Sequence, residues 1–367
     1  MIKKIQQDFS YYSHEFKDNY RKGVHRLRTI LASRAQAQAF VSNAGGTAVV
    51  LGYEPETPDK NAQELYALLA ASPYIDDAVQ TFLGSIYEAG AESQDAMYSD
   101  SARCLEILHD PVMSRAAGAG TVSAGKWIAT LAGQSCNLYR DMNAVAASDI
   151  AMTAVAASET AMEAVISSTI ALNAVAASKT AMTAVAANET AMVAVAASRV
   201  AMSAIIGNST ALNAVVTSSV AMAAVIGNSA ALNAVVSSQT AMAAIIGNST
   251  ALNAVVSSQT AMAAIAASST ALSAIAASTT ALDAIYAKKK RMSGASASLS
   301  GKFIILQISN DNAFDTSKYG YATLSDGSKP KWDSYKDKYA YFKQYKKIAT
   351  YMKNDTDSDD WIDYFQC

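Results

Sequence analysis

Large apolar residues recur along the middle of the chain with a period of ten. Between residues 151 and 287 successive repeats follow one consensus, A-[ML]-x-A-[VI]-x-x-[SN]-x-[TVIA], and the flanking segments DMNAVAASDI and RMSGASASLS read as decayed copies. Within a repeat the large apolar side chains are three and seven residues apart, which is a helical spacing, whereas a half-buried strand requires strict alternation. The pattern therefore predicts one helical segment in every ten residues.

A continuous helix would not keep this stripe on one side. Ten residues at 100° each fall about 80° short of three turns, far more than the ~20° per heptad that coiled coils absorb. Ser or Asn stands at position eight, and Gly precedes Asn at 207–208, 227–228 and 247–248. Asn and Ser are preferred N-caps, and Gly is preferred just past a helix end. These signals favour short helices stacked along an axis; an overwound helical bundle and a β-solenoid with two repeats per coil are the alternatives.

The repeat carries almost no charge. No charged residue occurs between Ala201 and Leu282, although the 367-residue chain has 29 Lys and Arg and 31 Asp and Glu. An exposed apolar stripe of this length exceeds what soluble monomers tolerate, so we expect copies of the chain to cover it. The candidate oligomerisation residues along the stripe are Met152, Val155, Met162, Val165, Leu172, Val175, Met202, Ile205, Leu212 and Val215.

The region before the repeat has aromatics, prolines and mixed charge. Residues 1–140 predict a helical N-terminal domain, in which Met1–Arg34 forms an amphipathic helix that either docks on a partner or presents a solvated basic face. Further helices are expected at 59–71, 74–89 and 99–108. The glycine-rich segment at 118–125 is expected to be a hinge or turn into the repeat.

Residues 301–367 predict a small β-containing domain. GKFIILQIS has strand composition, and YGYATLSDG alternates like a strand and closes in an Asp-Gly turn. Aromatic rings beside lysines suit acidic or phosphorylated glycans; the alternative is that these rings build the domain's own core. The candidate receptor-binding residues are Tyr319, Tyr321, Trp332, Tyr335, Tyr339, Tyr341, Lys336, Lys338 and Trp361.

Other chemistry finds little support in the sequence. The 3 cysteines lack CxxC spacing, and NDTDSDD at 354–360 lacks the glycine and glutamate of an EF-hand loop, so no metal and no cofactor are expected. No catalytic residues are proposed. The first residues lack the apolar core of a secretory signal, and no apolar run reaches the roughly 18 residues of a membrane span. We expect folding in the cytoplasm, with no nucleic acid partner and no membrane insertion.

The decapeptide array, followed by a segment opening with SGKFIILQIS, resembles the repeat-bearing tail-fibre and virion structural proteins of tailed bacteriophages over roughly residues 141–310. The resemblance implies a mainly α, fibrous homotrimer in a virion, with attachment to tail or baseplate proteins through 1–140, a shaft at 141–300 and a tip at 301–367. The tip would bind host surface polysaccharide. A purely structural linker or collar fibre is the alternative, and a glycan depolymerase is opposed by the lack of a convincing acid pair.

Overall fold

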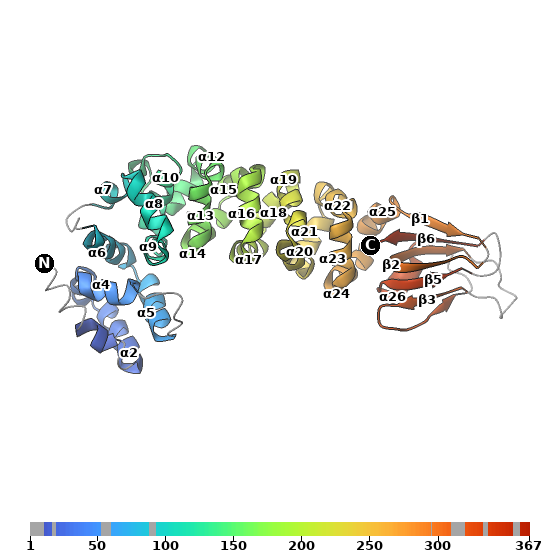
Figure 1. Ribbon diagram of the computed structural model, residues 1–367, viewed down its shortest axis with the longest axis horizontal. Helices are drawn as coiled ribbons and strands as arrows, with labels where there is room; N and C mark the ends of the chain where they lie inside the picture. The colour runs from blue at the N-terminus through green and yellow to red at the C-terminus, as the bar shows by residue number, and fades with distance from the viewer. Residues whose placement is uncertain are drawn as a thin grey trace. The chain divides into compact units, whose positions relative to one another are not determined.

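The computed structural model is mainly helical and ends in a small antiparallel sheet (Figure 1). It describes residues 11–16, 20–52, 60–87, 93–294, 296–309, 320–332, 337–354 and 360–367. The chain divides into two compact units, residues 1–195 and 196–367, and each contains part of the ten-residue repeat. A mainly α chain with a small β-containing C-terminal part is therefore confirmed.

Helices fill the part of the first compact unit that precedes the repeat. They are α2 (Tyr20–Ala32), α3 (Arg34–Val41), α4 (Ala44–Leu51), α5 (Lys60–Ala70), α6 (Ile75–Ile86), α7 (Gln94–Tyr98), α8 (Ser101–His109), α9 (Pro111–Ala117), α10 (Thr121–Leu131) and the short 3-10 helix η1 (Cys136–Leu138). The helices expected near 59–71, 74–89 and 99–108 correspond to α5, α6 and α8. Asp110 caps α9 by accepting the N–H groups of Val112 and Met113, and Pro111 occupies its first position, where no helical hydrogen bond is lost.

The glycine-rich segment 118–125 is not the hinge that its composition suggested. Its second half belongs to α10, where Asp76 Oδ1 accepts the N–H groups of Val122 (3.1 Å) and Ser123 (2.9 Å). A Cβ atom on Gly125 would lie only 2.4 Å from the peptide that joins Asp141 and Met142. The missing side chain therefore permits close packing between α10 and the first repeat helix rather than flexibility.

Each repeat forms one short helix. In the first compact unit these are α11 (Met142–Ala147), α12 (Asp149–Ala157), α13 (Glu159–Ser167), α14 (Thr169–Ala177), α15 (Lys179–Ala187) and α16 (Glu189–Ala197), within which the unit ends. In the second they are α17 (Arg199–Gly207), α18 (Ser209–Thr217), α19 (Ser219–Gly227), α20 (Ser229–Val236), α21 (Gln239–Ile246), α22 (Ser249–Val256), α23 (Gln259–Ala267), α24 (Ser269–Ala277) and α25 (Thr279–Tyr286). The expectation of short helices is confirmed, and the β-solenoid alternative is wrong.

The residue at position eight both ends one helix and starts the next. At Ser158 the backbone N–H donates to the carbonyl of Val155 (3.1 Å), while Oγ accepts the N–H of Ala161 (3.2 Å). The Ser158 φ of -105° and ψ of 116° are extended, so the chain leaves the helical path for a single residue. Asn208 plays the same part with its Oδ1. Ser and Asn at this position are thus N-caps, as their side-chain chemistry predicts.

The glycines before three of these asparagines have a different role from the one expected. A glycine that ends a helix usually adopts a left-handed conformation. Gly247 instead has a φ of -74°, and Gly207 and Gly227 are the last residues of their helices. Position seven is exposed in every repeat, so a small residue there meets solvent and is not required by the backbone.

Three helices complete one coil of a solenoid. Consecutive helices turn by 91–102° in the pairs α12–α13, α14–α15, α18–α19, α20–α21 and α23–α24. Within each compact unit, repeat helices then pack on the third helix along the chain, as α12 does on α15 and α19 on α22. Because packed helix axes lie about 8–10 Å apart, a coil of three repeats advances the chain by only about that distance.

The apolar stripe lies inside the coils of a single chain. Positions one, two and five of the repeat are buried, while positions seven and nine are exposed. The ten residues expected between copies of the chain are each 0–6% exposed in the single chain: Met152, Val155, Met162, Val165, Leu172, Val175, Met202, Ile205, Leu212 and Val215. Helices of the same chain cover them, so the apolar stripe gives no reason for self-association. A trimer stays a prediction of the resemblance alone.

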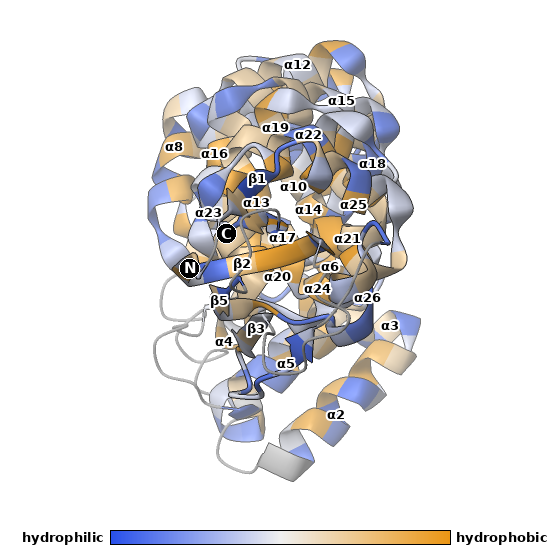
Figure 2. Ribbon diagram, turned by 90° about the vertical axis from the view of Figure 1, so that its right-hand side faces the viewer, coloured by the Kyte–Doolittle hydropathy of each residue, from blue (hydrophilic) through white to orange (hydrophobic). Residues whose placement is uncertain are grey.

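The second compact unit ends in a six-stranded antiparallel sheet of order β1-β6-β2-β5-β3-β4. The strands are β1 (Lys290–Ser293), β2 (Ser298–Ser309), β3 (Gly320–Leu324), β4 (Lys331–Trp332), β5 (Ala349–Lys353) and β6 (Trp361–Gln366), with helix α26 (Ala340–Tyr345) before β5. Figure 2 shows β2 changing from hydrophilic to hydrophobic along its length, and its second half is buried at the centre of the sheet. The strands expected from GKFIILQIS and YGYATLSDG are β2 and β3, and Gly327 has the positive φ (81°) of the expected Asp-Gly turn.

The sheet begins earlier than the sequence suggested. RMSGASASLS, interpreted as a decayed repeat, forms most of β1 and the start of β2. Position two of this segment is Met292, whose side chain belongs to the apolar core of the sheet. The segment kept an apolar residue at the repeat position but lost the helix, so the boundary lies near Lys290 rather than at residue 301.

The caps yield a matched test of solenoid stability. Ser268 Oγ accepts the N–H of Ala271 and also donates to the carbonyl of Val236 in the neighbouring coil (2.7 Å), whereas Ser278 Oγ caps Ala281. We expect Ser278→Ala to lower the free energy of unfolding by about 1 kcal/mol. Ser268→Ala should cost about 1 kcal/mol more, because the hydrogen bond between coils is also lost.

Urea unfolding followed by far-UV circular dichroism measures both variants. Equal losses would mean that the hydrogen bond from Ser268 to Val236 does not stabilise the stacking of coils.

Candidate binding site in the C-terminal sheet domain

Three aromatic residues expected on a receptor-binding surface lie inside the sheet domain. Trp332, Tyr339 and Tyr341 are 1%, 3% and 1% exposed. The rings of Trp332 and Tyr341 meet edge to face at 5.5 Å, and both belong to the apolar cluster on the sheet. A buried ring does not contact a receptor, so these are core residues. The pattern of alternating Tyr and Lys did not separate rings that pack on the sheet from rings at its surface.

Three other candidates are at the surface. Lys338 is exposed, and Tyr321 and Trp361 are partly exposed. Strands β2 and β5 lie between β3, which holds Tyr321, and β6, which holds Trp361, so these two positions are about 14 Å apart at ~4.8 Å per strand. Tyr321 lies instead beside Tyr351 of β5, with ring centroids 5.6 Å apart.

The remaining candidates, Tyr319, Tyr335 and Lys336, lie outside the residues that the structure describes. Their role in receptor binding stays a prediction.

A buried carboxylate organises the place where the last repeat helix meets the sheet. Asp363 of β6 is fully buried and accepts two hydrogen bonds from Arg291 of β1, at 2.6 and 2.8 Å. Lys289 Nζ lies 3.4 Å from the same carboxylate. The Tyr286 hydroxyl at the end of α25 donates to it at 3.2 Å and lies 3.0 Å from Gln307 Oε1. One acid therefore joins α25, β1 and β6.

A second acid, Asp283, lies on α25, one turn before Tyr286. Asp283 of α25 pairs with Lys338 Nζ at 2.7 Å and accepts a hydrogen bond from the Tyr339 hydroxyl. The ring of Tyr286 connects the two acids, because Lys338 Nζ and Lys289 Nζ lie 4.5 and 3.7 Å from its centroid. Such cation–π contacts are worth about 0.5–1 kcal/mol at exposed sites. The structure thus brings the predicted residues Lys338 and Tyr339 together through partners that the sequence did not single out.

We call this group the junction cluster: Asp283, Tyr286, Lys289, Arg291, Lys338, Tyr339, Trp361 and Asp363. Trp361 belongs to it because the guanidinium of Arg291 stacks 3.7 Å from its ring centroid. The signal in the sequence was the basic run at 288–291, which directly follows the last repeat and precedes the first strand.

The cations of the junction cluster lower the pKa values of its two carboxylates. Burial by itself would raise the pKa of Asp363, but hydrogen bonds and charge from Arg291, with the charge of Lys289, outweigh it and hold the pKa below its ordinary value. Hydrogen bonds from Lys338 and then Tyr339 lower the pKa of Asp283. Both carboxylates are therefore ionised at neutral pH, and the cations beside them stay protonated.

Cationic side chains and one aromatic ring reach the surface around this core. Lys288, Lys290 and Arg291 are exposed along the edge strand β1 and the residues before it, and Lys290 Nζ binds Gln366 Oε1 at 2.8 Å. Trp361 lies partly exposed beside Arg291. Lysines on an edge strand also keep it from pairing with another sheet, which is a structural role that needs no ligand. Chemically, the surface matches a ligand that carries both anionic groups and an apolar ring face.

The helices and the possible metal ligands were also compared with the requirements of a membrane span and of a metal site. None of the helices in the described ranges is both long and apolar enough to cross a membrane, although 6 pairs of consecutive helices pass that test if joined across bends of 91–102°. No group of three or more His, Cys, Asp or Glu side chains in the described part of the chain is placed to hold a metal ion. Cys104 and Cys136 are buried free thiols, and burial raises the pKa of Cys104 to about 12.

No protein-family model matches the chain, and none of the curated proteins matches it.

The lowered pKa of Asp363 predicts an acid-sensitive junction. An unfolded aspartate titrates near pH ~3.9, so the stability due to Asp363 is present above that pH and is lost as pH falls through the lower pKa of the folded state. We expect Asp363→Asn to lower the free energy of unfolding at pH 7 by roughly 2 kcal/mol, because it leaves two partly solvated cations unpaired.

Thermal unfolding followed by near-UV circular dichroism between pH 7 and pH 3 measures this effect. The wild-type midpoint should fall more steeply below pH 4 than that of Asp363→Asn. Parallel pH profiles would show that Asp363 is not held ionised by its partners.

Proposed function

We propose that the chain is a structural and adhesive component of a bacteriophage virion, a tail-fibre protein whose solenoid separates an N-terminal attachment region from a C-terminal domain that binds acidic glycan on the host surface. The observation that carries the proposal is the uncharged solenoid fixed by the junction cluster to a sheet whose outer edge is cationic. The resemblance of the repeat to tail-fibre proteins supplies the biological setting.

The part of the solenoid from Ala201 to Leu282 is suited to a spacer because its repeats carry no charge. From Ala201 to Leu282 its exposed positions hold only uncharged, mostly small residues. Such a surface offers no charged group to a ligand. The buried apolar side chains at positions one, two and five pack neighbouring coils together. With about 8–10 Å per coil, the three coils of α17–α25 span roughly 25–30 Å, so the spacer is short for its length of chain.

Acidic glycan fits the cationic edge of the sheet. A partly exposed Trp361 offers a ring face on which a sugar can stack, and the exposed Lys288 and Lys290 attract carboxylate or sulfate groups. Each exposed ion pair adds only about 0.2–1 kcal/mol, so one tip binds weakly. Several tips on one particle would convert weak contacts into avidity. A trimer, which the resemblance implies, would supply such multivalency.

The alternative function is a linker or collar fibre whose C-terminal domain binds another virion protein. The same cationic edge would then face an acidic protein surface. Labelled full-length protein added separately to host bacteria and to purified particles distinguishes the two. Adsorption to cells supports the tip function, whereas retention on particles through the C-terminal domain supports the linker.

Charge reversal on the edge tests the glycan hypothesis directly. We expect full-length protein to bind polygalacturonate and dextran sulfate but not neutral dextran, with binding that weakens as salt rises. Lys288→Glu with Lys290→Glu should weaken binding about tenfold, which corresponds to about 1.4 kcal/mol.

Lys179→Glu with Arg199→Glu makes the same change in net charge on exposed solenoid positions and is the matched control. Biolayer interferometry on immobilised polysaccharide measures both double variants. Equal weakening in the two would mean that net charge, rather than the sheet edge, governs binding.

The oligomeric state has its own measurement. Light scattering of the purified chain should give three times the monomer mass of 38.4 kDa if the resemblance to trimeric fibres holds. A monomer would leave the solenoid a complete single-chain structure and would make avidity depend on how many copies a particle carries.

A further inference from the structure

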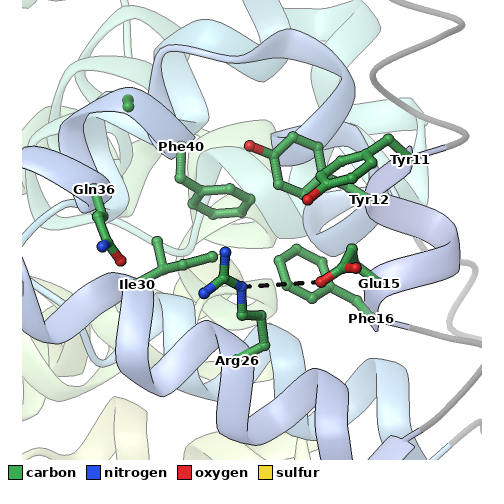
Figure 3. A pocket seen from close by; sticks show the side chains of 9 residues that line it. Tyr11, Tyr12, Glu15, Phe16, Arg26, Ile30, Gln36 and Phe40 are labelled. Atoms are coloured by element: carbon green, nitrogen blue, oxygen red, sulfur yellow. Dashed lines mark ion pairs between the residues drawn. The ribbon is translucent and has the colours of Figure 1, made fainter.

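The first compact unit contains a hollow near its N-terminal end. Its volume is about 260 Å³, and its walls come from the helical residues 11–16 and from α2 and α3 (Figure 3). The lining side chains are Tyr11, Tyr12, Glu15, Phe16, Arg26, Ile30, Gln36, Ala39 and Phe40. The hollow is lined partly by Met1–Arg34, for which the sequence left open a docking helix or a solvated basic face, and partly by α3 beyond it. Residues 1–10 and 17–19 of that segment lie outside the described residues.

The floor of the hollow is a packed aromatic cluster. Phe16 and Phe40 are 0% and 1% exposed, with ring centroids 5.7 Å apart. The ring of Tyr12 lies 5.5 Å from Phe16 and 5.4 Å from Phe40. Because three rings hold one another from three directions, the apolar floor exists before any ligand arrives. A preformed pocket avoids the ordering cost that reduces binding affinity.

The rim of the hollow is polar and carries one cation. Arg26 of α2 has a half-exposed side chain, and its Nε lies 3.9 Å from Glu15 Oε2, too far for a hydrogen bond. Arg115, elsewhere in the same compact unit, instead donates to the carbonyl of Leu51 at 2.7 Å. Arg26 makes no such bond to a described residue, and its half-exposed guanidinium lines the hollow.

The size of the hollow indicates what it holds. Sites for small molecules usually measure about 300–1,000 Å³, so this one is small for a metabolite or an oligosaccharide. Protein interfaces, in contrast, are anchored by single aromatic side chains that fill pockets of one residue's size. An aromatic floor favours an aromatic anchor through edge-to-face contacts.

The charge around the hollow indicates the second feature of the ligand. Helices α2 and α3, with the sequences YRKGVHRLRTILA and RAQAQAFV, contain no acidic residue. Figure 2 shows α2 with hydrophobic and hydrophilic residues in alternation along its length. Among the described residues that line the hollow, Glu15 is the one acid. The guanidinium of Arg26 and the basic face of α2 therefore favour an anion beside the anchor.

We propose that this hollow, the N-terminal anchor pocket, receives an aromatic side chain of a partner protein with a carboxylate next to it, held by Arg26. The inference deepens the proposed attachment function and rests on it for the identity of the partner as a protein of the particle. The pocket chemistry itself does not depend on that identity. The occupant is a protein segment in which Phe, Tyr or Trp stands beside Asp, Glu or the chain's own C-terminal carboxylate.

Small probes test the pocket in the full-length protein. Saturation-transfer NMR with 3-phenylpropionate, phenethylamine and hexanoate separates the contributions of ring and charge. We expect 3-phenylpropionate to bind at least fivefold more tightly than either of the other two. Arg26→Glu should weaken its binding at least fivefold and bring phenethylamine to equal or tighter binding.

Two matched controls keep the result specific. Arg28→Glu reverses a charge on the same helix at a side chain that pairs with Glu64 (3.6 Å) and does not line the pocket, so probe binding should persist. Ala39→Phe places a ring at the exposed rim without changing a core residue and should block the probe, whereas Gln38→Phe on the same helix should not. Thermal melts of each variant confirm that the fold is intact.

Three outcomes would overturn the proposal. Equal binding of the cationic and anionic probes would remove the role of Arg26, and binding unchanged by Ala39→Phe would place the probe elsewhere. A fall in solution mass caused by Arg26→Glu would mean that a second copy of this chain is the occupant. Probe binding that persists while the full-length protein fails to attach to particles would leave the pocket valid and refute the attachment function instead.

Discussion

A single hydrogen-bonded residue, the Ser or Asn at position eight, determines the architecture of the repeat. Its side chain satisfies an N–H group that the first turn of the next helix would otherwise leave unpaired, and its extended backbone turns the chain by about a right angle. Three such turns bring the fourth helix onto the first. Without the cap, these helices, most of them eight or nine residues long, would have no fixed angle between them, and isolated helices of that length are marginal in water. The coils, and so the burial of the apolar stripe, follow from this residue.

The geometry of the coil also explains how a repeat with few charges buries its apolar side chains without a partner. Ala at position one is almost fully buried in every repeat from Ala151 to Ala281, which lets neighbouring helices approach closely, and the Met, Leu, Val or Ile at positions two and five fills the centre. The argument for self-association assumed a rod with one exposed stripe. A coil of three helices has an inside, and that inside is where the stripe lies. What remains outside is mostly Ser, Thr, Asn and Ala, with a few exposed apolar side chains, Ile150, Val193 and Val200 among them.

The short helices of the repeat could be predicted from the sequence because several independent features agree. Helical spacing, cap residues and the failure of a continuous helix to keep its register all indicated short helices. The number of helices per coil was not accessible, because it depends on the turn angle at Ser158 and its equivalents. The hinge predicted for segment 118–125 was wrong because Gly125 permits close contact with a neighbouring helix, and composition does not distinguish that role from flexibility. Trp332 and Tyr341 were predicted at the binding surface but are buried, because alternating Tyr, Trp and Lys residues do not reveal which rings pack on the sheet and which face solvent.

The junction cluster shows why the solenoid and the sheet form one compact unit in the second half of the chain. The Asp363 carboxylate is fully buried, and a buried charge destabilises the fold unless hydrogen-bond donors surround it. Arg291 and Lys289 come from the segment at the start of the sheet, whereas the Tyr286 hydroxyl comes from the last repeat helix. A sheet without α25 would lose one of those donors, and an α25 without the sheet would leave Asp283 without Lys338 and Tyr339. Each part thus completes the polar groups of the other, so a rigid connection, rather than a hinge, joins the repeat to the cationic edge that carries the proposed binding surface.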